Sequence, residues 1–262
     1  MSLTNFPNGI TSFGVPVIPG GIPFGKSSKA FFVDPVAGLD GNKGTDISRP
    51  LKTLSKAHSL CTSGANDVVF MISRTNTSSD TTDYQSAVLT WSKDACHLIG
   101  INAGGNVAQR SRIAQLSTAT NIDNLFTVSG NNCIIANIHV FHGVADATSK
   151  GAVSVSGSRN HFINCHFAGI GHADMDTADN YSLSLSGSEN LFEGCTIGLD
   201  TIARGSAANY EMVFSGGATR NTFKDCSVIG YAESATNYKF LKVAANGIDR
   251  WTLFKGCVFM NM

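Results

Sequence analysis

The residues of this chain that are best suited to chemistry lie in one acidic loop, Gly169–Asn180. The loop carries His172, Asp174, Asp176 and Asp179. An Asp-x-Asp pair offers the hard oxygen ligands that Ca²⁺ takes, and paired carboxylates can share the acid and base roles of glycosidic bond cleavage. The loop lacks the ligand spacing of an EF-hand, and acidic residues are also common in solvated turns. We therefore predict no metal site in this loop. Asp174 and Asp176 are the weak candidates for ligands if an ion does bind there.

Other side chains add little to this loop. The segment that follows it contributes one carboxylate, Asp200. A catalytic histidine needs a nucleophile and an orienting partner within about 3 Å, and the serines lie in no nucleophile-elbow motif. Five of the seven histidines are scattered over different positions of the repeats, at His139, His142, His161, His166 and His172. We therefore expect exposed histidines in strands and turns, no catalytic residue and no cofactor.

The elements that position these residues come from a segment that recurs four times. The copies are Asn160–Phe167, Asn190–Ile197, Asn221–Val228 and Thr252–Phe259. Their cysteines are 30, 31 and 31 residues apart. Apolar pairs with alternating spacing precede the copies, such as Val153/Val155, as in half-buried strands. A period of about thirty residues is typical of stacked units and leaves no room for a regular helix in each. The sequence therefore predicts an all-β parallel β-helix of about six coils, about 4.8 Å apart.

Equivalent residues of successive coils should stack into ladders. Asparagine suits a tight bend, where it tolerates positive φ and its amide can bond to the next coil. Phenylalanine and cysteine should point inward, and alternating charges should point outward. The expected ladders are Asn132, Asn160, Asn190 and Asn221; Cys165, Cys195, Cys226 and Cys257; Phe162, Phe192, Phe223 and Phe254; and Arg159, Glu189 and Arg220. We also expect Tyr181, Tyr210 and Tyr238 to pack at a coil corner or a subunit interface, with sugar stacking as the alternative.

Composition excludes several classes of function. The chain has 262 residues, of which 42% are hydrophobic and 15% are charged, and its formal net charge is zero. A neutral chain gives no electrostatic reason to bind nucleic acid or an anionic membrane, and no segment resembles a signal peptide or a membrane span. The seven cysteines form no Cys-x-x-Cys pair, which argues against zinc and against a disulfide framework. We expect buried thiols and folding in a reducing cytoplasm.

The N-terminal part differs from the repeats. Residues 1–28 contain four prolines and no charge before Lys26, yet they are too apolar for a solvated tail. We expect an extended arm that docks on another surface through Phe6, Pro7, Ile10, Phe13, Val15, Val17, Ile18 and Phe24. Residues 29–66 should form a cap, with a strand at Ala30–Asp34, a loop and a short helix over Pro50–Cys61. Residues 67–262 should form the β-helix.

Two resemblances extend this interpretation. The segment FFVDPVAGLDGNKGT…RPLKTLSKA at residues 31–57 resembles the N-terminal cap of pectate-lyase-like right-handed β-helix proteins. The leader FPNGITSFGVPV…GG resembles the start of virion structural proteins of tailed bacteriophages. The first resemblance implies a right-handed fold over residues 29–262, and the second implies a place in a phage particle. The fold alone does not give the function, because lyases, hydrolases, tailspikes and virion decorations share it.

Together these patterns predict a structural virion protein. The last coil carries Trp251, Phe254, Phe259, Met260 and Met262, and we expect a homotrimer to cover it. The arm would bind the major capsid protein or another virion protein, so that the trimer decorates the phage head after assembly in the host cytoplasm. We expect no nucleic-acid partner, no membrane and no enzymatic activity. The alternatives are a tailspike or fibre that recognises, or also cleaves, a host surface polysaccharide, and a stand-alone polysaccharide lyase or hydrolase.

Overall fold

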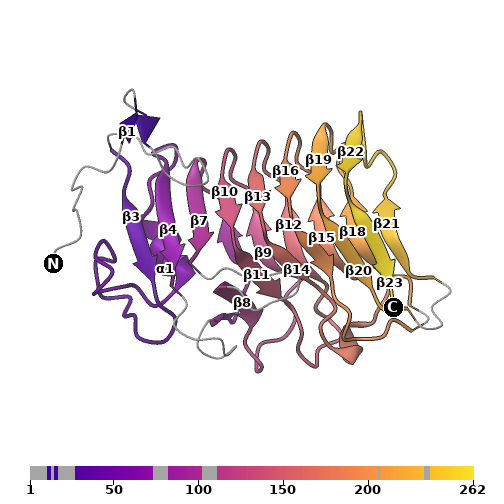
Figure 1. Cartoon of the computed structure of the whole chain (residues 1–262). Helices are drawn as coiled ribbons and strands as arrows, with labels where there is room; N and C mark the ends of the chain where they lie inside the picture. The colour runs from indigo at the N-terminus through magenta and orange to yellow at the C-terminus, as the bar shows by residue number, and fades with distance from the viewer. Residues whose placement is uncertain are drawn as a thin grey trace.

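The chain forms a solenoid of parallel strands with very little helix. The computed structural model describes residues 11–12, 15–16, 27–72, 82–101, 111–205, 207–232 and 237–262. Three long sheets run side by side along the solenoid, and successive coils follow one another from the N-terminal to the C-terminal end (Figure 1). The prediction of an all-β parallel β-helix of about six coils with a short helix is confirmed.

The three sheets are named here by one of their strands. The β4 sheet consists of β3 (Ala30–Val33), β4 (Asp67–Met71), β7 (Cys96–Gly100), β10 (Ile134–Ala136), β13 (His161–Ile163), β16 (Leu191–Glu193), β19 (Asn221–Lys224) and β22 (Thr252–Lys255). The β8 sheet consists of β5 (Thr82–Gln85), β8 (Ser111–Gln115), β11 (Ile138–Phe141), β14 (His166–Ala168), β17 (Thr196–Gly198), β20 (Ser227–Gly230) and β23 (Val258–Asn261). The β12 sheet consists of β6 (Leu89–Trp91), β9 (Asn124–Val128), β12 (Gly151–Val155), β15 (Tyr181–Leu185), β18 (Tyr210–Phe214) and β21 (Lys239–Val243).

Aromatic stacking fills the centre of the C-terminal half. The rings of Phe162 and Phe192 lie 4.7 Å apart, those of Phe192 and Phe223 4.5 Å, and those of Phe223 and Phe254 4.8 Å, each pair nearly parallel. This spacing equals the separation of neighbouring strands, so one ring per coil gives continuous contact. The first three rings are fully buried, and Phe254 is half-buried in the last coil.

The cysteines are free and line the interior beside these rings. Cys165, Cys195 and Cys226 are buried, and Cys257 is half-buried. The Cys195 thiol lies 3.5 Å from the Phe162 carbonyl oxygen, which belongs to the preceding coil. Burial raises the pKa of Cys195 well above its usual range, so this thiol stays protonated at neutral pH. Buried thiols of this kind act as small apolar side chains.

The asparagine ladder holds three residues, one from each of three coils. The side-chain oxygens of Asn160, Asn190 and Asn221 accept from the backbone N–H of Cys133, Asn160 and Asn190, at 2.8, 2.9 and 2.9 Å. The inclusion of Asn132 was wrong by one residue. Since Ile134 pairs with His161, it is Cys133 that lies in register with Asn160.

Asn132 lies instead at the bend that precedes this ladder. It has a φ of 56°, and the equivalent bends hold Arg159, Glu189 and Arg220 at 59°, 59° and 54°. These charged residues form the exposed outward ladder, with Arg159 2.8 Å and Arg220 3.2 Å from the carboxylate of Glu189. Exposed pairs of this kind contribute little stability.

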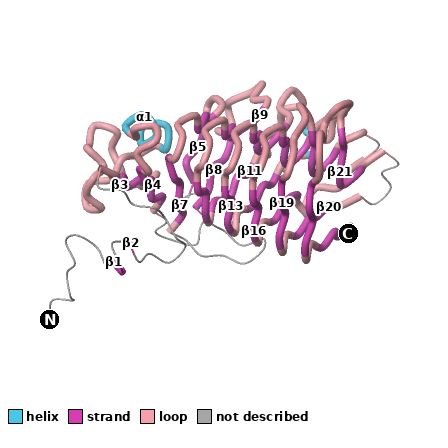
Figure 2. The backbone as a smooth tube through the Cα atoms, turned by 90° about the horizontal axis from the view of Figure 1, so that it is seen from above, coloured by secondary structure: helices cyan, strands magenta, loops and turns pink. Residues whose placement is uncertain are grey.

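The N-terminal cap is continuous with the solenoid. Strand β3 pairs in parallel with β4, and helix α1 (Leu54–Leu60) lies at this end beside them (Figure 2). The helix begins four residues later than predicted from Pro50. Asp40 accepts from the backbone N–H groups of Lys52 and Thr53, at 2.9 and 3.0 Å. These contacts keep the preceding segment extended until Thr53 caps the helix by accepting from the N–H of Lys56.

The predicted arm falls mostly outside the described residues. Two short antiparallel strands are described in it, β1 (Thr11–Ser12) and β2 (Val15–Pro16), and Val15 belongs to the second. The other arm residues named above, Phe6, Pro7, Ile10, Phe13, Val17, Ile18 and Phe24, lie outside the described part. Docking of the arm on a virion protein therefore stays a prediction.

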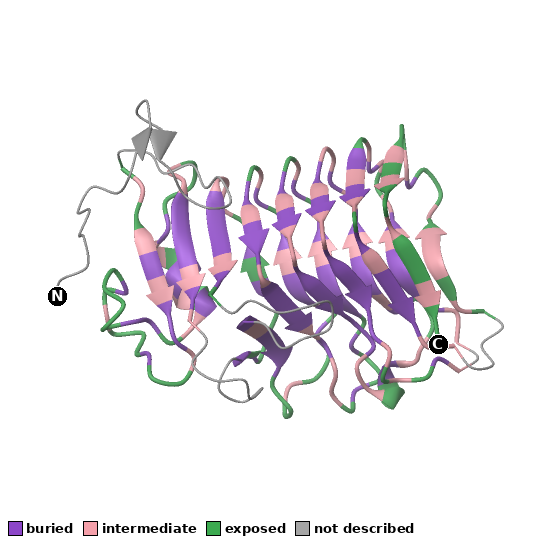
Figure 3. Ribbon diagram, viewed as in Figure 1, coloured by how far each residue is buried: buried purple, intermediate pink, exposed green. Residues whose placement is uncertain are grey.

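Exposure increases toward the last coil. Most strand residues in the middle of the solenoid are buried or half-buried, whereas β21, β22 and β23 carry many exposed positions (Figure 3). The exposed apolar side chains there include Trp251, Leu253 and Val258. No helix in the described ranges is long and apolar enough to cross a lipid bilayer. A trimer that covers the last coil stays a prediction.

Candidate functional site

The acidic loop joins β14 to β15, but its carboxylates do not converge. Asp174 is exposed. Asp176 accepts from the backbone N–H of Gly205 at 2.6 Å and from the side chain of Asn209. Asp179 forms an ion pair with Lys242, with 2.5 Å between Oδ1 and Nζ. The three groups thus have separate partners, and among the described residues no cluster of three or more His, Cys, Asp or Glu side chains could hold a metal ion.

The remaining members of this loop region have local roles. His172 accepts from the backbone N–H of Asp174 at 3.2 Å and caps the short 3₁₀ helix η1 (Ala173–Met175). Asp200 is half-buried in the following loop. Neither side chain lies with Asp179 at the hollow described below.

The other histidines are mostly buried, contrary to the expected exposure. His139 and His166 stack with 4.5 Å between ring centroids, because His139 pairs in register with His166. His142 is buried, and its Nδ1 donates to the carbonyl oxygen of Gly151 at 2.6 Å. Burial lowers the pKa of His142 to about 4. His161 is half-buried and lies 3.2 Å from the carboxylate of Glu193. Strands β14 and β17 of the β8 sheet are buried at every position, and a local sequence pattern cannot reveal burial of both faces.

The outer face of the β12 sheet carries a row of small hydroxyl side chains. We call it the hydroxyl row, and it consists of Thr90, Thr127, Ser154 and Ser184, which pair in register from coil to coil. Because their neighbours Phe126, Val153 and Leu183 are buried in the core, the alternation of a strand turns the hydroxyls outward. One hydroxyl every 4.8 Å or so gives a regular line of donors and acceptors.

A hollow of about 300 Å³ adjoins this row. We call it the Tyr181 hollow, and its lining residues are Asp123, Asn124, Lys150, Asp179, Tyr181, Val213 and Lys242. The Tyr181 hydroxyl donates to Asn124 Oδ1 at 2.6 Å. Its ring lies over Gly151, where an added Cβ would be 2.1 Å from a ring atom. A glycine is therefore needed beneath the ring.

Electrostatic contacts set the charge state of the hollow. The hydrogen bond to Asp179 raises the pKa of Lys242 above its usual value, and the Lys242 ammonium also lies 4.7 Å from the centre of the Tyr210 ring. Burial raises the pKa of Tyr181, so its hydroxyl stays a donor at neutral pH. The hollow thus combines an aromatic ring and an amide with side chains of both charges. Such a set can bind a polar ring compound and move a proton.

The predicted tyrosine series contributes two of its three members to this region. Tyr181 pairs in register with Tyr210, but Tyr210 pairs with Lys239. Tyr238 is therefore one residue out of the series, and its hydroxyl donates to Glu211 at 3.2 Å. Tyr181 and Tyr210 each lie two residues before the next apolar pair, whereas Tyr238 lies three residues before Leu241, which accounts for the offset.

Sequence reasoning missed five residues of the hollow, Asp123, Asn124, Lys150, Val213 and Lys242. Lys242 had a detectable signal, because it occupies the register position of Ser184 and Val213. Asp123 and Lys150 precede strands at positions that no repeat marks. The buried pair of Arg204 and Glu211 was missed as well, since Arg204 lies in a loop without periodicity.

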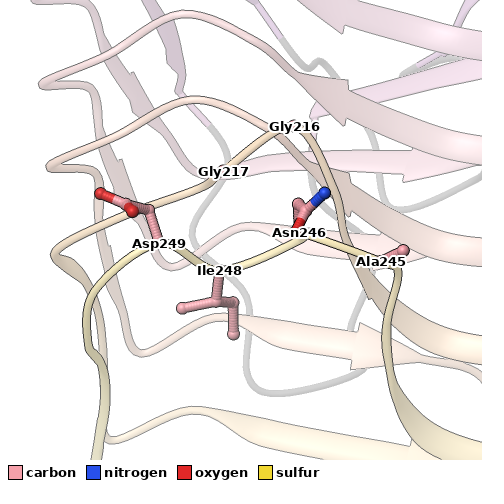
Figure 4. A pocket seen from close by; sticks show the side chains of 6 residues that line it. All are labelled: Gly216, Gly217, Ala245, Asn246, Ile248 and Asp249. Carbon is pink, nitrogen blue, oxygen red and sulfur yellow. The ribbon is translucent and has the colours of Figure 1, made fainter.

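A second hollow, of about 590 Å³, lies at the turns between β18 and β19 and between β21 and β22. Gly216 and Gly217 line one side, and Ala245, Asn246, Ile248 and Asp249 line the other (Figure 4). It offers one carboxylate and one amide, so it has fewer functional groups than the Tyr181 hollow despite its larger volume.

Comparisons with known proteins rest on structure alone. No family model matches the chain, and no curated protein matches it. A rhamnogalacturonan lyase is similar, with a TM-score of 0.52 and 18% identity over 89% of this chain and 63% of that one. Pectate lyase Pel9A has a TM-score of 0.46 and 11% identity over 88% and 77%. The deglycosylated pectin methylesterase from Aspergillus niger has a TM-score of 0.46 and 15% identity over 88% and 86%.

These neighbours correct one expectation. The prediction that the chain is not an enzyme is contradicted, because the similar solved structure with a TM-score above 0.5 is a rhamnogalacturonan lyase. The chain spans 63% of the length of the rhamnogalacturonan lyase, and at 18% identity that likeness speaks for the fold. The expected architecture is confirmed: this chain has the right-handed parallel β-helix fold of pectate-lyase-like proteins.

Proposed function

We propose that this chain binds a polysaccharide along the outer face of the β12 sheet and acts on it at the Tyr181 hollow. The observation that carries the proposal is the continuity of the hydroxyl row with that hollow. Ser184 and Val213 are neighbours in register, and Val213 lines the hollow together with Tyr181. A sugar chain that follows the row would meet hydroxyls first and then an aromatic ring with charged groups.

The chemistry of the lining supports processing as well as binding. Asp123 and Asp179 supply carboxylates, and Lys150 and Lys242 supply ammonium groups. Two carboxylates are the usual groups for glycosidic acid–base chemistry, and a cationic group can stabilise the negative charge that develops during proton abstraction. The enzymes with a similar fold are named for rhamnogalacturonan and pectin, which makes an acidic polysaccharide the first class to test.

The N-terminal segment, residues 1–28, favours a second role that is compatible with polysaccharide binding. Residues 1–28 resemble the arms of tailed-phage virion proteins. We infer that the chain is carried on a phage particle as a homotrimer, attached through this arm to the major capsid protein or another virion protein. A polysaccharide site on such a particle would recognise the host surface, which corresponds to the tailspike alternative. Head decoration remains the competing location for the same attachment.

The first experiment compares two leucine substitutions on different faces. Ser184→Leu would block the hydroxyl row beside the hollow. Thr222→Leu is the matched control, because Thr222 points outward from the β4 sheet between Leu191 and Leu253 in register. Both proteins and the unmodified chain are tested by affinity electrophoresis on a panel of neutral and acidic polysaccharides. Release of reducing ends and of unsaturated uronates is measured on the same panel.

The proposal expects binding by the unmodified chain and by Thr222→Leu, and loss of binding by Ser184→Leu. Equal behaviour of the two variants, or no polysaccharide bound by the unmodified chain, would overturn it. Release of unsaturated products identifies elimination, and release of reducing ends alone identifies hydrolysis. Deletion of residues 1–28 tests the virion element, since it should abolish co-sedimentation with phage particles and leave polysaccharide binding intact.

A further inference from the structure

An ion pair without solvent exposure lies beneath the loops next to the Tyr181 hollow. Arg204 Nη2 lies 3.1 Å from Glu211 Oε1, and both side chains are 0% exposed. The other carboxylate oxygen of Glu211 accepts from the Ser182 hydroxyl at 2.5 Å, and Oε1 also accepts from the Tyr238 hydroxyl at 3.2 Å. Ser182, Glu211 and Tyr238 come from three successive coils, so this single carboxylate joins all three.

Glycines make room for this network. A Cβ added to Gly198 would lie 2.8 Å from Glu211 Oε2, and one added to Gly230 would lie 1.9 Å from the Tyr238 hydroxyl. Both glycines are the last residues of their strands, β17 and β20. The strand ends therefore approach the carboxylate and the phenol more closely than any residue with a side chain would allow.

The arginine extends the network into two loops. Arg204 Nη1 donates to the carbonyl oxygens of Ile170 and Ile202, at 3.2 and 2.9 Å. Ile170 belongs to the acidic loop, and Ile202 belongs to the loop of the next coil. The guanidinium therefore holds the two loops together from the inside, where no water competes for its hydrogen bonds.

The same two loops also bind each other next to Asp179. The backbone N–H of Asp179 donates to the carbonyl oxygen of Ala208 at 2.8 Å, and Asp176 accepts from the N–H of Gly205 at 2.6 Å. The place of the Asp179 carboxylate therefore depends on the loop that Arg204 anchors. That carboxylate lines the hollow and pairs with Lys242.

From this chain of contacts we infer that Arg204 and Glu211 are positioning residues, whose buried ion pair sets the location of Asp179 in the Tyr181 hollow; the inference rests on the proposed function. A buried ion pair is a poor way to gain stability, because desolvation offsets much of its attraction and well-packed apolar residues often replace it without loss. Apolar residues cannot replace the hydrogen bonds of this pair, which connect Arg204 to two loops and Glu211 to the two neighbouring coils.

The test separates positioning from stability with three variants. Arg204→Met and Glu211→Leu each leave one buried charge without its partner. The double variant removes both charges and restores an apolar match. Arg220→Met is the control, because Arg220 forms an exposed ion pair with Glu189 on another part of the surface. Each protein is measured for free energy of unfolding, for hydrogen exchange of the Asp179 amide and for affinity toward the polysaccharide that the unmodified chain binds.

Positioning predicts that the single variants lose stability and that the double variant regains it. The Asp179 amide should nevertheless exchange at least tenfold faster in the double variant, and affinity should fall about tenfold or more, as displaced functional groups do. Recovery of both slow exchange and affinity in the double variant would overturn the inference, since the pair would then be merely structural. Failure of the unmodified chain to bind any polysaccharide would refute the proposed function instead, and the Asp179 exchange rate would still decide whether the pair positions that loop.

Discussion

Asp83 and Lys93 hold opposite ends of helix α1, although both belong to the coil that follows it. Asp83 Oδ2 accepts from the backbone N–H of Leu54, the first helical residue, at 2.8 Å. The Lys93 ammonium donates to the carbonyl oxygens of His58, Ser59 and Cys61, at 2.7, 2.8 and 2.5 Å. A negative group at the N-terminus and a positive group at the C-terminus both complement the helix dipole. The cap is thus fixed to the solenoid by charge at both ends of a two-turn helix.

Replacement of Lys93 by methionine should loosen this cap. The variant keeps most of the side-chain volume but leaves the last helical carbonyls without their donor, so we expect a loss of about 1–3 kcal/mol in the free energy of unfolding. Urea unfolding measures the loss, and amide exchange over residues 54–60 locates it. Lys52→Met is the control, because Lys52 is exposed and should change little. Equal losses in both variants would refute the role of Lys93.

Asp83 should make the folded chain more stable as the pH falls from about 6 to about 4. Burial raises its pKa to about 6, against the usual 3.8. The folded chain therefore holds a proton that the unfolded chain lacks between about pH 6 and pH 4, and this group adds stability as the pH falls through that window. Asp83→Asn keeps an acceptor for Leu54 without the charge. Its stability relative to the unmodified chain should be highest at pH 7 and should decline toward pH 4, as measured by urea unfolding at each pH. A constant difference would contradict the raised pKa.

Buried histidines should have the opposite effect. Burial lowers the pKa of His58, His97 and His142 to about 4 each. The unfolded chain then binds more protons than the folded chain between about pH 6.5 and pH 4, so these groups contribute stability above that window and lose it as the pH falls. His142→Asn retains a donor for the Gly151 carbonyl. We expect it to be less stable at pH 7 but to lose less on acidification, and an unchanged pH profile would show that His142 does not contribute.

The asparagine ladder gives a comparison between two positions that look alike in the sequence. Asn190→Ala leaves the buried N–H of Asn160 and the carbonyl of Gly157 without their partners, so it should cost about 2–4 kcal/mol. Asn132→Ala removes no ladder bond and adds only the strain of alanine at positive φ, about 1 kcal/mol. Thermal and urea unfolding of the two variants decide the matter. An equal loss of unfolding free energy in Asn132→Ala and Asn190→Ala would instead support the sequence-based prediction that Asn132 belongs to the ladder.

Periodicity explains which parts of the fold were predictable. Phe162, Phe192 and Phe223 recur with their cysteines at nearly constant spacing, so their inward stack follows from the sequence. Asn132 was misplaced because this coil is shorter: Cys133 lies in register with Asn160, 27 residues later, whereas the next asparagines are 30 and 31 residues apart. The helix begins at Leu54 because Asp40 accepts hydrogen bonds from the backbone of Lys52 and Thr53. Asp40 lies outside the helical pattern, so the sequence did not reveal this start.

The candidate site was less predictable because coils bring distant residues together. Asp179 was recognised from its acidic loop. Its partner Lys242 lies two coils farther along, and only the register of the strands shows that the two are close. Arg204 and Glu211 differ by seven residues, yet one lies in an irregular loop and the other on a strand position where the neighbouring coil has Ser182. Whether two such residues meet depends on loop conformation and burial, and neither produces a periodic pattern in the sequence.

The direction of the asparagine bonds bears on how the chain is made. Asn160 reaches Cys133 and Gly130, Asn190 reaches Asn160 and Gly157, and Asn221 reaches Asn190 and Gly187, so that each of these bonds runs from a side-chain amide to a residue synthesised before it. One further bond, from Asn190 Nδ2 to Asn221 Oδ1 at 3.2 Å, runs toward the later coil. A coil leaving the ribosome therefore finds the backbone groups of the preceding coil already available for the bonds of its own asparagine side chain. Growth of the solenoid can keep pace with translation, one rung at a time, from the amino-terminal cap onward.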